Sequence, residues 1–164
     1  MPVTLRPTTA DDLHALDRLF ADSYPALLAA DYPAPLLAAA LPVIARAQPH
    51  LLASGSYYLI EEGGAALAAG GWTAESPHGQ EAPGTGHIRH VVTHPGATRR
   101  GLASRLLDLC FAEARAAGLS GLVAISTRTA VPFYRAKGFA IAREIELPLA
   151  PGIAFPAIRM ARPL

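Results

Sequence analysis

The fold of this chain is decided by the stretch HIRHVVTHPGATRRGLASRLLDLCFAEARAA, which occupies residues 87–117. It contains β-branched residues at 91–93, a Pro-Gly pair at 95–96, and an apolar periodic segment that starts at Leu102. β-Branched residues favour a strand, and Pro-Gly favours a turn. Apolar residues that recur every three or four positions are typical of a helix that packs one face on a core. The stretch therefore predicts a strand, a tight turn and a helix.

The start of the predicted helix is rich in small residues. A helix N-terminus has unpaired N–H groups and a partial positive charge, so a phosphate placed there gains several charge-assisted hydrogen bonds. Small side chains let the phosphate approach the main chain closely. An ordinary helix that follows a loop is the alternative interpretation. We predict a pyrophosphate cradle made by the backbone of Arg99, Arg100, Gly101, Leu102, Ala103 and Ser104.

Two short motifs follow one another in the chain: Arg-Arg-Gly-Leu-Ala at residues 99–103 and Tyr-Arg-Ala-Lys-Gly-Phe at residues 134–139. Together they resemble the GNAT superfamily of N-acetyltransferases. Its acyl-CoA-binding pattern is Gln or Arg, any two residues, Gly, any residue, then Gly or Ala. Gly101 and Ala103 match this pattern, whereas Thr98 stands at its first position. The resemblance implies an acetyltransferase that uses acetyl-CoA as cosubstrate.

Length and composition favour one folded domain over residues 1–164. The chain is 51% hydrophobic and 16% charged, which argues for a core and against disorder. We expect an α/β, GNAT-type fold with a central mixed, mostly antiparallel sheet of about six to seven strands flanked by helices. Strand patterns lie at residues 3–6, 57–60, 65–73, 87–93, 122–126, 139–147 and 153–160, and helix patterns at 9–20, 35–47 (a pair of short helices broken by prolines), 102–117 and 131–137.

Charge and cysteine content exclude several classes of protein. A formal net charge of +1 gives no general attraction to nucleic acid. Cys110 is the only cysteine, which excludes an intrachain disulfide and an all-cysteine metal site, and we expect no metal. Prolines and charges interrupt the apolar stretch at 26–47, so we expect no membrane span. The N-terminus lacks a signal-peptide pattern, and we expect a cytoplasmic protein.

Acetyl transfer requires a deprotonated amine and a proton for the departing thiolate. The resemblance implies that Tyr134 is the general acid, because a phenol is neutral at pH 7 and can donate to sulfur. Packing of its ring between helix and sheet is the alternative. His87 stands where some relatives carry a glutamate that deprotonates the amine, and an imidazole suits that role. Glu75 and Glu81 in the preceding loop are competitors for it. In a regular strand, His87 and His90 would point to opposite faces.

The resemblance also implies cofactor contacts outside the cradle. In this family the strand that precedes the turn splays from its neighbour. The free backbone groups there pair with the pantetheine arm and polarise the thioester carbonyl. In this chain that backbone belongs to Val91, Val92 and Thr93. Thr127 stands where the family often has an asparagine that touches the cofactor.

The acceptor side carries fewer signals. In this fold the region at 23–49, the loop at 75–86 and the last two strands commonly shape the acceptor pocket. A small amine, an amino acid and a protein N-terminus all stay open as acceptors, and the resemblance is compatible with a homodimer. Candidate pocket walls are Tyr24, Tyr32, Trp72 and Phe155, although an aromatic residue is more often simply part of the core.

Two rival classes of protein compete with this interpretation. A nucleotide-binding P-loop requires Gly-Lys-Ser/Thr, and here Gly101 is followed by Leu102, so a kinase is disfavoured. A non-catalytic acyl-CoA sensor, or a protein-interaction module on the same fold, is the alternative to an enzyme. The presence of Tyr134 favours an enzyme.

Overall fold

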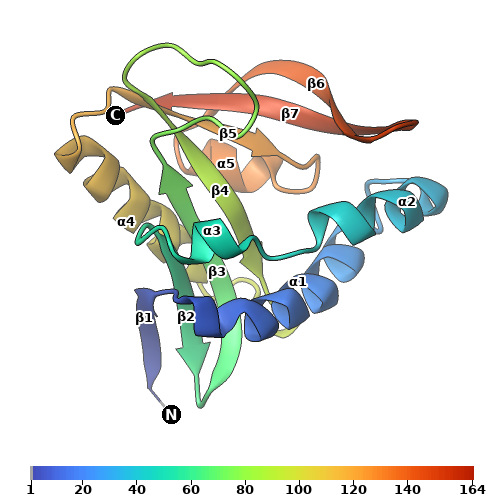
Figure 1. Cartoon of the computed structure of the whole chain (residues 1–164), viewed down its shortest axis with the longest axis horizontal. Helices are drawn as coiled ribbons and strands as arrows, with labels where there is room; N and C mark the ends of the chain where they lie inside the picture. Colours follow the sequence, from blue (N-terminus) through green and yellow to red (C-terminus); the bar gives the residue numbers. More distant parts are fainter. Residues whose placement is uncertain (1) are drawn as a thin grey trace.

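A seven-stranded sheet runs through the computed structural model, which describes residues 2–164 (Figure 1). Its strands lie in the order β1-β2-β3-β4-β5-β7-β6, and every neighbouring pair is antiparallel except β4 and β5. This arrangement confirms the predicted mixed, mostly antiparallel sheet. The strands are β1 (Val3–Pro7), β2 (Tyr57–Glu62), β3 (Ala65–Thr73), β4 (Thr85–Thr93), β5 (Gly121–Ser126), β6 (Ala140–Ala150) and β7 (Ile153–Pro163).

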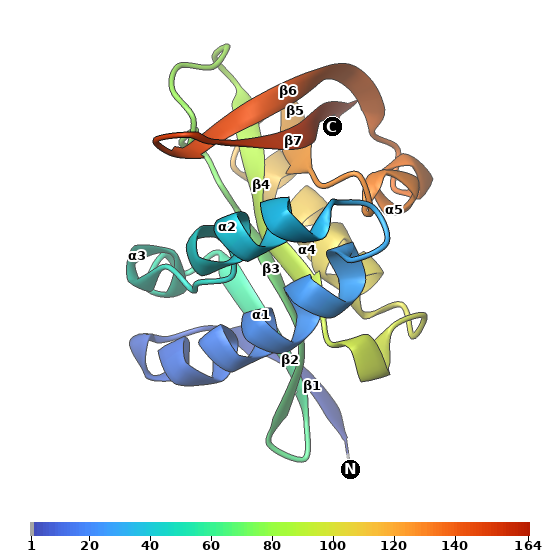
Figure 2. The ribbon, with the colours of Figure 1, turned by 90° about the vertical axis from the view of Figure 1, so that its right-hand side faces the viewer.

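Helices cover both faces of the sheet. Helices α1 and α3 lie on one face and α4 and α5 on the other, whereas α2 packs beneath the β6–β7 hairpin (Figures 1 and 2). No helix in residues 2–164 has the length and apolar character needed to cross a membrane. The helices are α1 (Leu13–Leu28), α2 (Ala34–Ile44), α3 (Pro49–Leu52), α4 (Leu102–Ala116) and α5 (Val131–Ala136), with short 3-10 turns at Ala10–Asp12 and Pro95–Ala97.

The entry into α1 is fixed by a capping box. The Thr9 hydroxyl accepts from the N–H of Asp11, and the Asp12 carboxylate accepts from the N–H of Thr9 at 2.8 Å. Asp12 also accepts two hydrogen bonds from Arg6 on β1, which ties the start of the helix to the sheet. These bonds satisfy donors that a helix start leaves unpaired.

The expected pair of short helices within residues 35–47 is wrong. One continuous helix, α2, spans Ala34–Ile44, and a separate short helix follows only at Pro49. Pro35 lies in the first turn, where its missing N–H is not needed. Pro42 lies near the end of α2 and removes one internal hydrogen bond, and the burial of Leu37 and other α2 residues against the β6–β7 hairpin offsets this loss.

Strand β4 is irregular in its second half. Ala69 pairs with Val92 whereas Gly71 pairs with Arg89, so β4 carries one extra residue opposite Gly70. This β-bulge places His90 at φ 41°. A Cβ on Gly70 would lie 3.0 Å from the Val91 side chain, so glycine allows the bulge to approach.

The pairing of β4 with its parallel neighbour β5 is short. The ladder joins residues 85–87 to residues 121–123 and stops there. Beyond His87 the two strands therefore separate, and the second half of β4 lacks β5 as a partner. The bulge and the splay together open the sheet at its centre.

Candidate functional site

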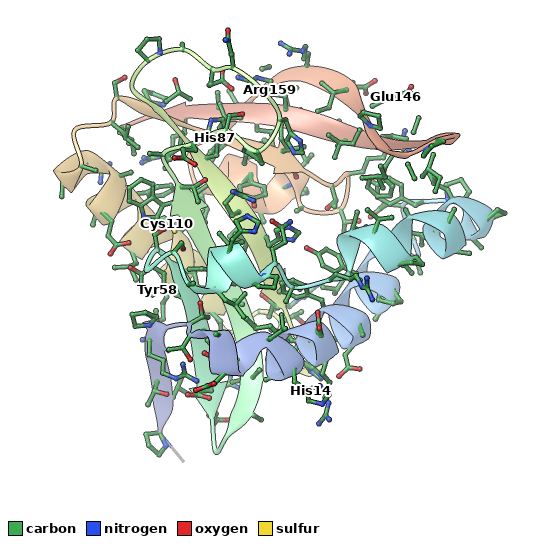
Figure 3. The ribbon with its side chains drawn as sticks, in the orientation of Figure 1. His14, Tyr58, His87, Cys110, Glu146 and Arg159 are labelled. Atoms are coloured by element: carbon green, nitrogen blue, oxygen red, sulfur yellow. The ribbon has the colours of Figure 1, made fainter. Side chains whose placement is uncertain are left out.

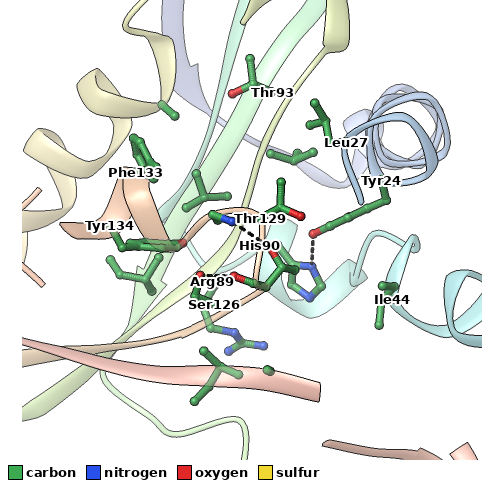
Figure 4. Close-up of a pocket in the computed structure, with 18 of the residues that line it drawn as sticks. Tyr24, Leu27, Ile44, Arg89, His90, Thr93, Ser126, Thr129, Phe133 and Tyr134 are labelled. Atoms are coloured by element: carbon green, nitrogen blue, oxygen red, sulfur yellow. Dashed lines mark hydrogen bonds between the residues drawn. The ribbon is translucent and has the colours of Figure 1, made fainter. Parts of the chain in front are cut away.

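A cavity of about 800 Å³ occupies the opening between β4 and β5 (Figure 4). The second half of β4 crosses its middle. We call the two sides the α4 half and the α2 half. The α4 half is lined by Ala97, Gly101, Ala103, Ser104, Thr127 and Tyr134, among others, and the α2 half by Tyr24, Leu27, Ile44, Gln48, Leu147 and Phe155, among others.

The start of α4 presents unpaired backbone donors to the α4 half. The first hydrogen bond of the helix runs from the N–H of Arg105 to the carbonyl of Gly101 at 3.1 Å, so the N–H groups of residues 102–104 precede it. Gly101 adopts φ 74°, and a Cβ there would meet nothing within 4 Å. Arg99 also adopts a positive φ, of 63°. This geometry suits an anion at the helix start.

The predicted cofactor residues fall almost entirely on the cavity. The exception is Arg100, which does not line it and whose guanidinium donates to Glu62 on β2 at 3.1 Å. Thr127 lines the cavity, but its hydroxyl accepts from the N–H of Ala130 at 3.3 Å and so also holds the turn before α5. The lining members of the predicted set are Val91, Val92, Thr93, Arg99, Gly101, Leu102, Ala103, Ser104 and Thr127.

Tyr134 lines the α4 half from helix α5. Its ring packs edge-on against Phe133 and Phe139, with centroid distances of 5.2 and 5.3 Å. Burial raises the pKa of the Tyr134 phenol, so the phenol keeps its proton throughout the neutral range. The residue therefore combines a packed ring with a protonated hydroxyl on the cavity.

A second tyrosine lies on the opposite wall. Tyr24 projects from α1, and Figure 4 shows its hydroxyl and that of Tyr134 pointing into the cavity from opposite sides. Burial raises the pKa of Tyr24 as well. Two neutral hydroxyl groups thus face the space between the two halves.

A chain of side-chain contacts orients Tyr24. The Arg89 guanidinium donates to Oε1 of Gln48 at 3.2 Å, which leaves the amide Nε2 of Gln48 as the donor to Nε2 of His90 at 3.0 Å. His90 then carries its proton on Nδ1, which donates to the Tyr24 oxygen at 3.5 Å. The hydroxyl hydrogen of Tyr24 is consequently free for a group in the cavity.

Two aromatic residues also fix the position of His90 in the bulge. The Tyr57 hydroxyl donates to the carbonyl of His90 at 2.7 Å, and the His90 ring stacks on Phe20 at 5.6 Å. Burial lowers the pKa of His90 to about 4, so its imidazole is neutral at pH 7.

His87 lines the cavity near its β7 wall, below Arg159 in the view of Figure 3. It is 3% exposed, and its Nε2 is buried without a hydrogen-bond partner. Burial lowers its pKa. Nε2 lies 4.0 Å from Glu81, whose carboxylate accepts a hydrogen bond of 2.7 Å from Arg159. Neither Glu81 nor Glu75 lines the cavity.

The regular alternation that predicts opposite faces for His87 and His90 does not hold through β4. Both residues line the cavity, as does every residue from His87 to Thr93. The bulge adds a residue between Arg89 and Val92 and turns His90 through a positive φ, which breaks the two-residue alternation. Only the regular part of β4, up to Arg89, follows the expected alternation.

Two of the four residues predicted as walls of the acceptor pocket line the cavity, and two do not. Tyr24 and Phe155 line the α2 half, whereas Tyr32 and Trp72 do not line the cavity. Tyr32 donates to the carbonyl of Pro156, and the Trp72 indole donates to Glu113. Among the lining residues that the sequence analysis did not name, Arg89 carried a usable signal, because an arginine inside a predicted strand requires a partner. Others include Gln48, Ile44 and Leu147.

Within the described chain, the cavity is lined by basic side chains without acidic ones. Over residues 2–164, its lining includes arginine and histidine but no aspartate or glutamate. In the same described part of the chain, no group of three or more His, Cys, Asp or Glu side chains is placed to hold a metal ion.

Comparison with sequence families gives one match. The family described as "Acetyltransferase (GNAT) family" matches residues 13–139, which include both motifs and most of the cavity. A comparison with curated protein sequences gives no significant match.

Solved structures similar to this chain share its fold at low sequence identity. One is the PaiA N-acetyltransferase of Thermoplasma acidophilum in complex with coenzyme A, at 12% identity and TM-score 0.76, covering 100% of both chains. Another is a GCN5-related N-acetyltransferase of Rhodopseudomonas palustris, at 19% identity and TM-score 0.78, covering 100% of this chain and 97% of that one. A third is the ribosomal-protein-S18-alanine N-acetyltransferase of Escherichia coli, at 18% identity and TM-score 0.64, covering 99% and 94%.

Proposed function

The chain belongs to the GNAT acetyltransferase family, and from that premise we propose that it transfers the acetyl group of acetyl-CoA to a primary amine by direct attack in a ternary complex. The observation that carries the proposal is the continuity of the cavity. One space joins the amide-rich start of α4 to a separate wall made by α1, α2 and β6–β7. Two substrates can therefore meet at β4.

Acetyl-CoA would lie along the α4 half. The N–H groups of residues 102–104 would bind its pyrophosphate, and the open space beside Gly101 leaves room for it. The backbone of residues 91–93, free of β5, would pair with the pantetheine arm and polarise the thioester carbonyl. These contacts use the main chain, so they tolerate a wide range of side chains.

The chemical step would use three groups. The amine nitrogen attacks the thioester carbonyl carbon, and the carbon–sulfur bond then breaks. The amine proton passes to the neutral His87 imidazole, directly or through water, and Tyr134 donates its proton to the departing thiolate. The depressed pKa of His87 and the raised pKa of Tyr134 put each group in the required protonation state at pH 7.

A non-catalytic acyl-CoA sensor on the same fold is the second candidate. Two measurements separate it from the enzyme: binding of acetyl-CoA by calorimetry, and release of free CoA thiol with a panel of amino acids, alkylamines and short peptides. The enzyme should bind acetyl-CoA and release thiol only when an acceptor is present. Tight binding without thiol release across the panel would favour the sensor.

A further inference from the structure

Arg89 is a buried cation without an anionic partner. Its side chain lies on the cavity wall beside His90, and the residue is 9% exposed (Figure 4). Its guanidinium donates to the hydroxyl of Thr73 at 3.2 Å and to Oε1 of Gln48 at 3.2 Å, and both acceptors are neutral. None of the ion pairs formed within residues 2–164 includes Arg89.

Other arginines of the chain show the usual arrangement. Arg6 and Arg100 are each paired with a carboxylate, although both are more exposed than Arg89. Arg159, on the strand that forms the nearby wall, donates to Glu81 at 2.7 Å. Taking a cation out of water is unfavourable unless an anion compensates it. Arg89 is thus a buried arginine whose charge is not compensated by an ion pair within residues 2–164.

The groups around Arg89 do not supply that charge. The cavity lining within the described chain contains no carboxylate. Its titratable neighbours include Tyr57, whose pKa burial raises, and histidines, and the Arg89 charge adds to the burial that lowers the pKa values of His87 and His90. Because a guanidinium has five N–H donors and Arg89 uses two, donors remain for a ligand.

We propose that Arg89 binds the carboxylate of the acceptor, and that the acceptor is an amino acid with an apolar side chain. The inference rests on the proposed acetyl transfer and selects one acceptor class from those it leaves open. Arg89 directly precedes the bulge, so a carboxylate held there keeps the amine of the same molecule near residues 91–93. A peptide N-terminus has no carboxylate at that position.

The rest of the α2 half fits the side chain of such an acceptor. Its walls include Leu27, Ile44, Leu147, Leu149 and Phe155, which offer an apolar surface without a charged group. An acidic or basic acceptor side chain would lose its hydration against these walls without gaining a partner. A branched or aromatic side chain would be stabilised by burial there.

The test compares L-leucine with L-leucinamide, which has the same shape and a neutral amide in place of the carboxylate. Arg89→Met should lower kcat/KM for leucine about a hundredfold more than for leucinamide, because truncating one partner of a buried charge pair has an effect of that order. The two acceptors differ in amine pKa. This difference cancels when the variant-to-wild-type ratio of kcat/KM for leucine is divided by the same ratio for leucinamide.

Three controls make the outcome decisive. Arg18→Met, on the exposed surface of α1, should leave the ratio unchanged. Arg89→Lys keeps the charge without the planar fork and should recover part of the preference for leucine. Calorimetry with acetyl-CoA should give wild-type affinity for both Arg89 variants, which shows that each variant is folded.

Equal losses for leucine and leucinamide in Arg89→Met would overturn the proposal and give Arg89 a role only in positioning Gln48 and the histidines. Leucine binding to the CoA complex, measured by calorimetry, separates this inference from the proposed function. Binding that depends on Arg89 without turnover would contradict only the enzyme, and no binding would contradict the amino-acid acceptor.

Discussion

The two halves of the cavity are built in different ways. The part of the α4 half that offers main-chain donors is one continuous segment, residues 97–104, at a helix start. The α2 half is made by side chains from α1, α2, the residue before α3, β6 and β7, which are far apart in the sequence. A site made from local backbone can be recognised from a short motif. A site made from distant side chains becomes visible only when the chain is folded.

This difference predicts that a change in one half should leave the ligand of the other half largely unaffected. The largest effect is expected at the start of α4. Gly101→Asp places a carboxylate beside the amides of residues 102–104 and should weaken acetyl-CoA binding about a thousandfold, because the new anion competes with the pyrophosphate for the same donors. Isothermal calorimetry measures the change.

Gly118→Asp provides the matched control for the strain of the substitution. Gly118 follows the same helix at its other end and adopts φ 84°, and a Cβ added there would likewise meet nothing within 4 Å. Its carboxylate lies far from the helix start, so acetyl-CoA affinity should match the wild type. An equal loss of affinity in both variants would assign the effect to the helix and not to the cradle.

The same difference explains what the sequence could predict. The mixed sheet, the strands predicted at 57–60 and 65–73 and the helix at 102 all follow from local patterns, and the structure confirms them. The bulge at His90 depends on Gly70 across the sheet, and no pattern within β4 marks it. The chain from Arg89 to Tyr24 requires Gln48, which is 41 residues away from Arg89. Contacts of this kind arise from tertiary packing alone.

The second prediction concerns the place where the halves meet. Tyr134→Phe keeps the packed ring and removes the proton, so kcat should fall about a hundredfold while acetyl-CoA affinity changes little. Steady-state thiol release measures the first quantity and calorimetry the second. Tyr58→Phe is the control, since its hydroxyl bonds to Glu113 and the residue does not line the cavity. Equal kcat values in the wild type and Tyr134→Phe would leave Tyr134 with a packing role only.

The third prediction tests whether the free energy of unfolding depends on pH mainly through the α2 half, where His90 lies, and less through the α4 half. Burial lowers the pKa of His90 to about 4, against 6.5 in the unfolded chain. Between these values the unfolded chain binds more protons, so stability is lost as the pH falls below 6.5. The loss from His90 at pH 5 is about 2 kcal/mol of unfolding free energy, or about a thirtyfold change in the unfolding constant.

Urea denaturation at pH 7 and pH 5 measures this loss. His90→Asn removes the titrating group, and asparagine tolerates the positive φ of this position better than most residues, so the variant should lose less stability between the two pH values. His14→Asn, on the exposed face of α1, should lose as much as the wild type. The same loss in all three proteins would show that the α2 half does not set the pH response.

The smallest change in kcat, measured at high pH, is expected for substitution of His87, the proposed base. At saturating substrates, kcat should rise with pH through the ionisation of His87, with a midpoint below 6.5 because burial lowers its pKa. His87→Gln should remove this limb. At pH 9 about a tenth of an amine with a pKa near 10 is already deprotonated, so the base can contribute at most about tenfold there. His14→Gln is the control, because His14 is exposed on α1 and does not line the cavity. If the limb persists in His87→Gln, another titrating group sets it, and His90, which also lines the cavity with a lowered pKa, becomes the candidate base.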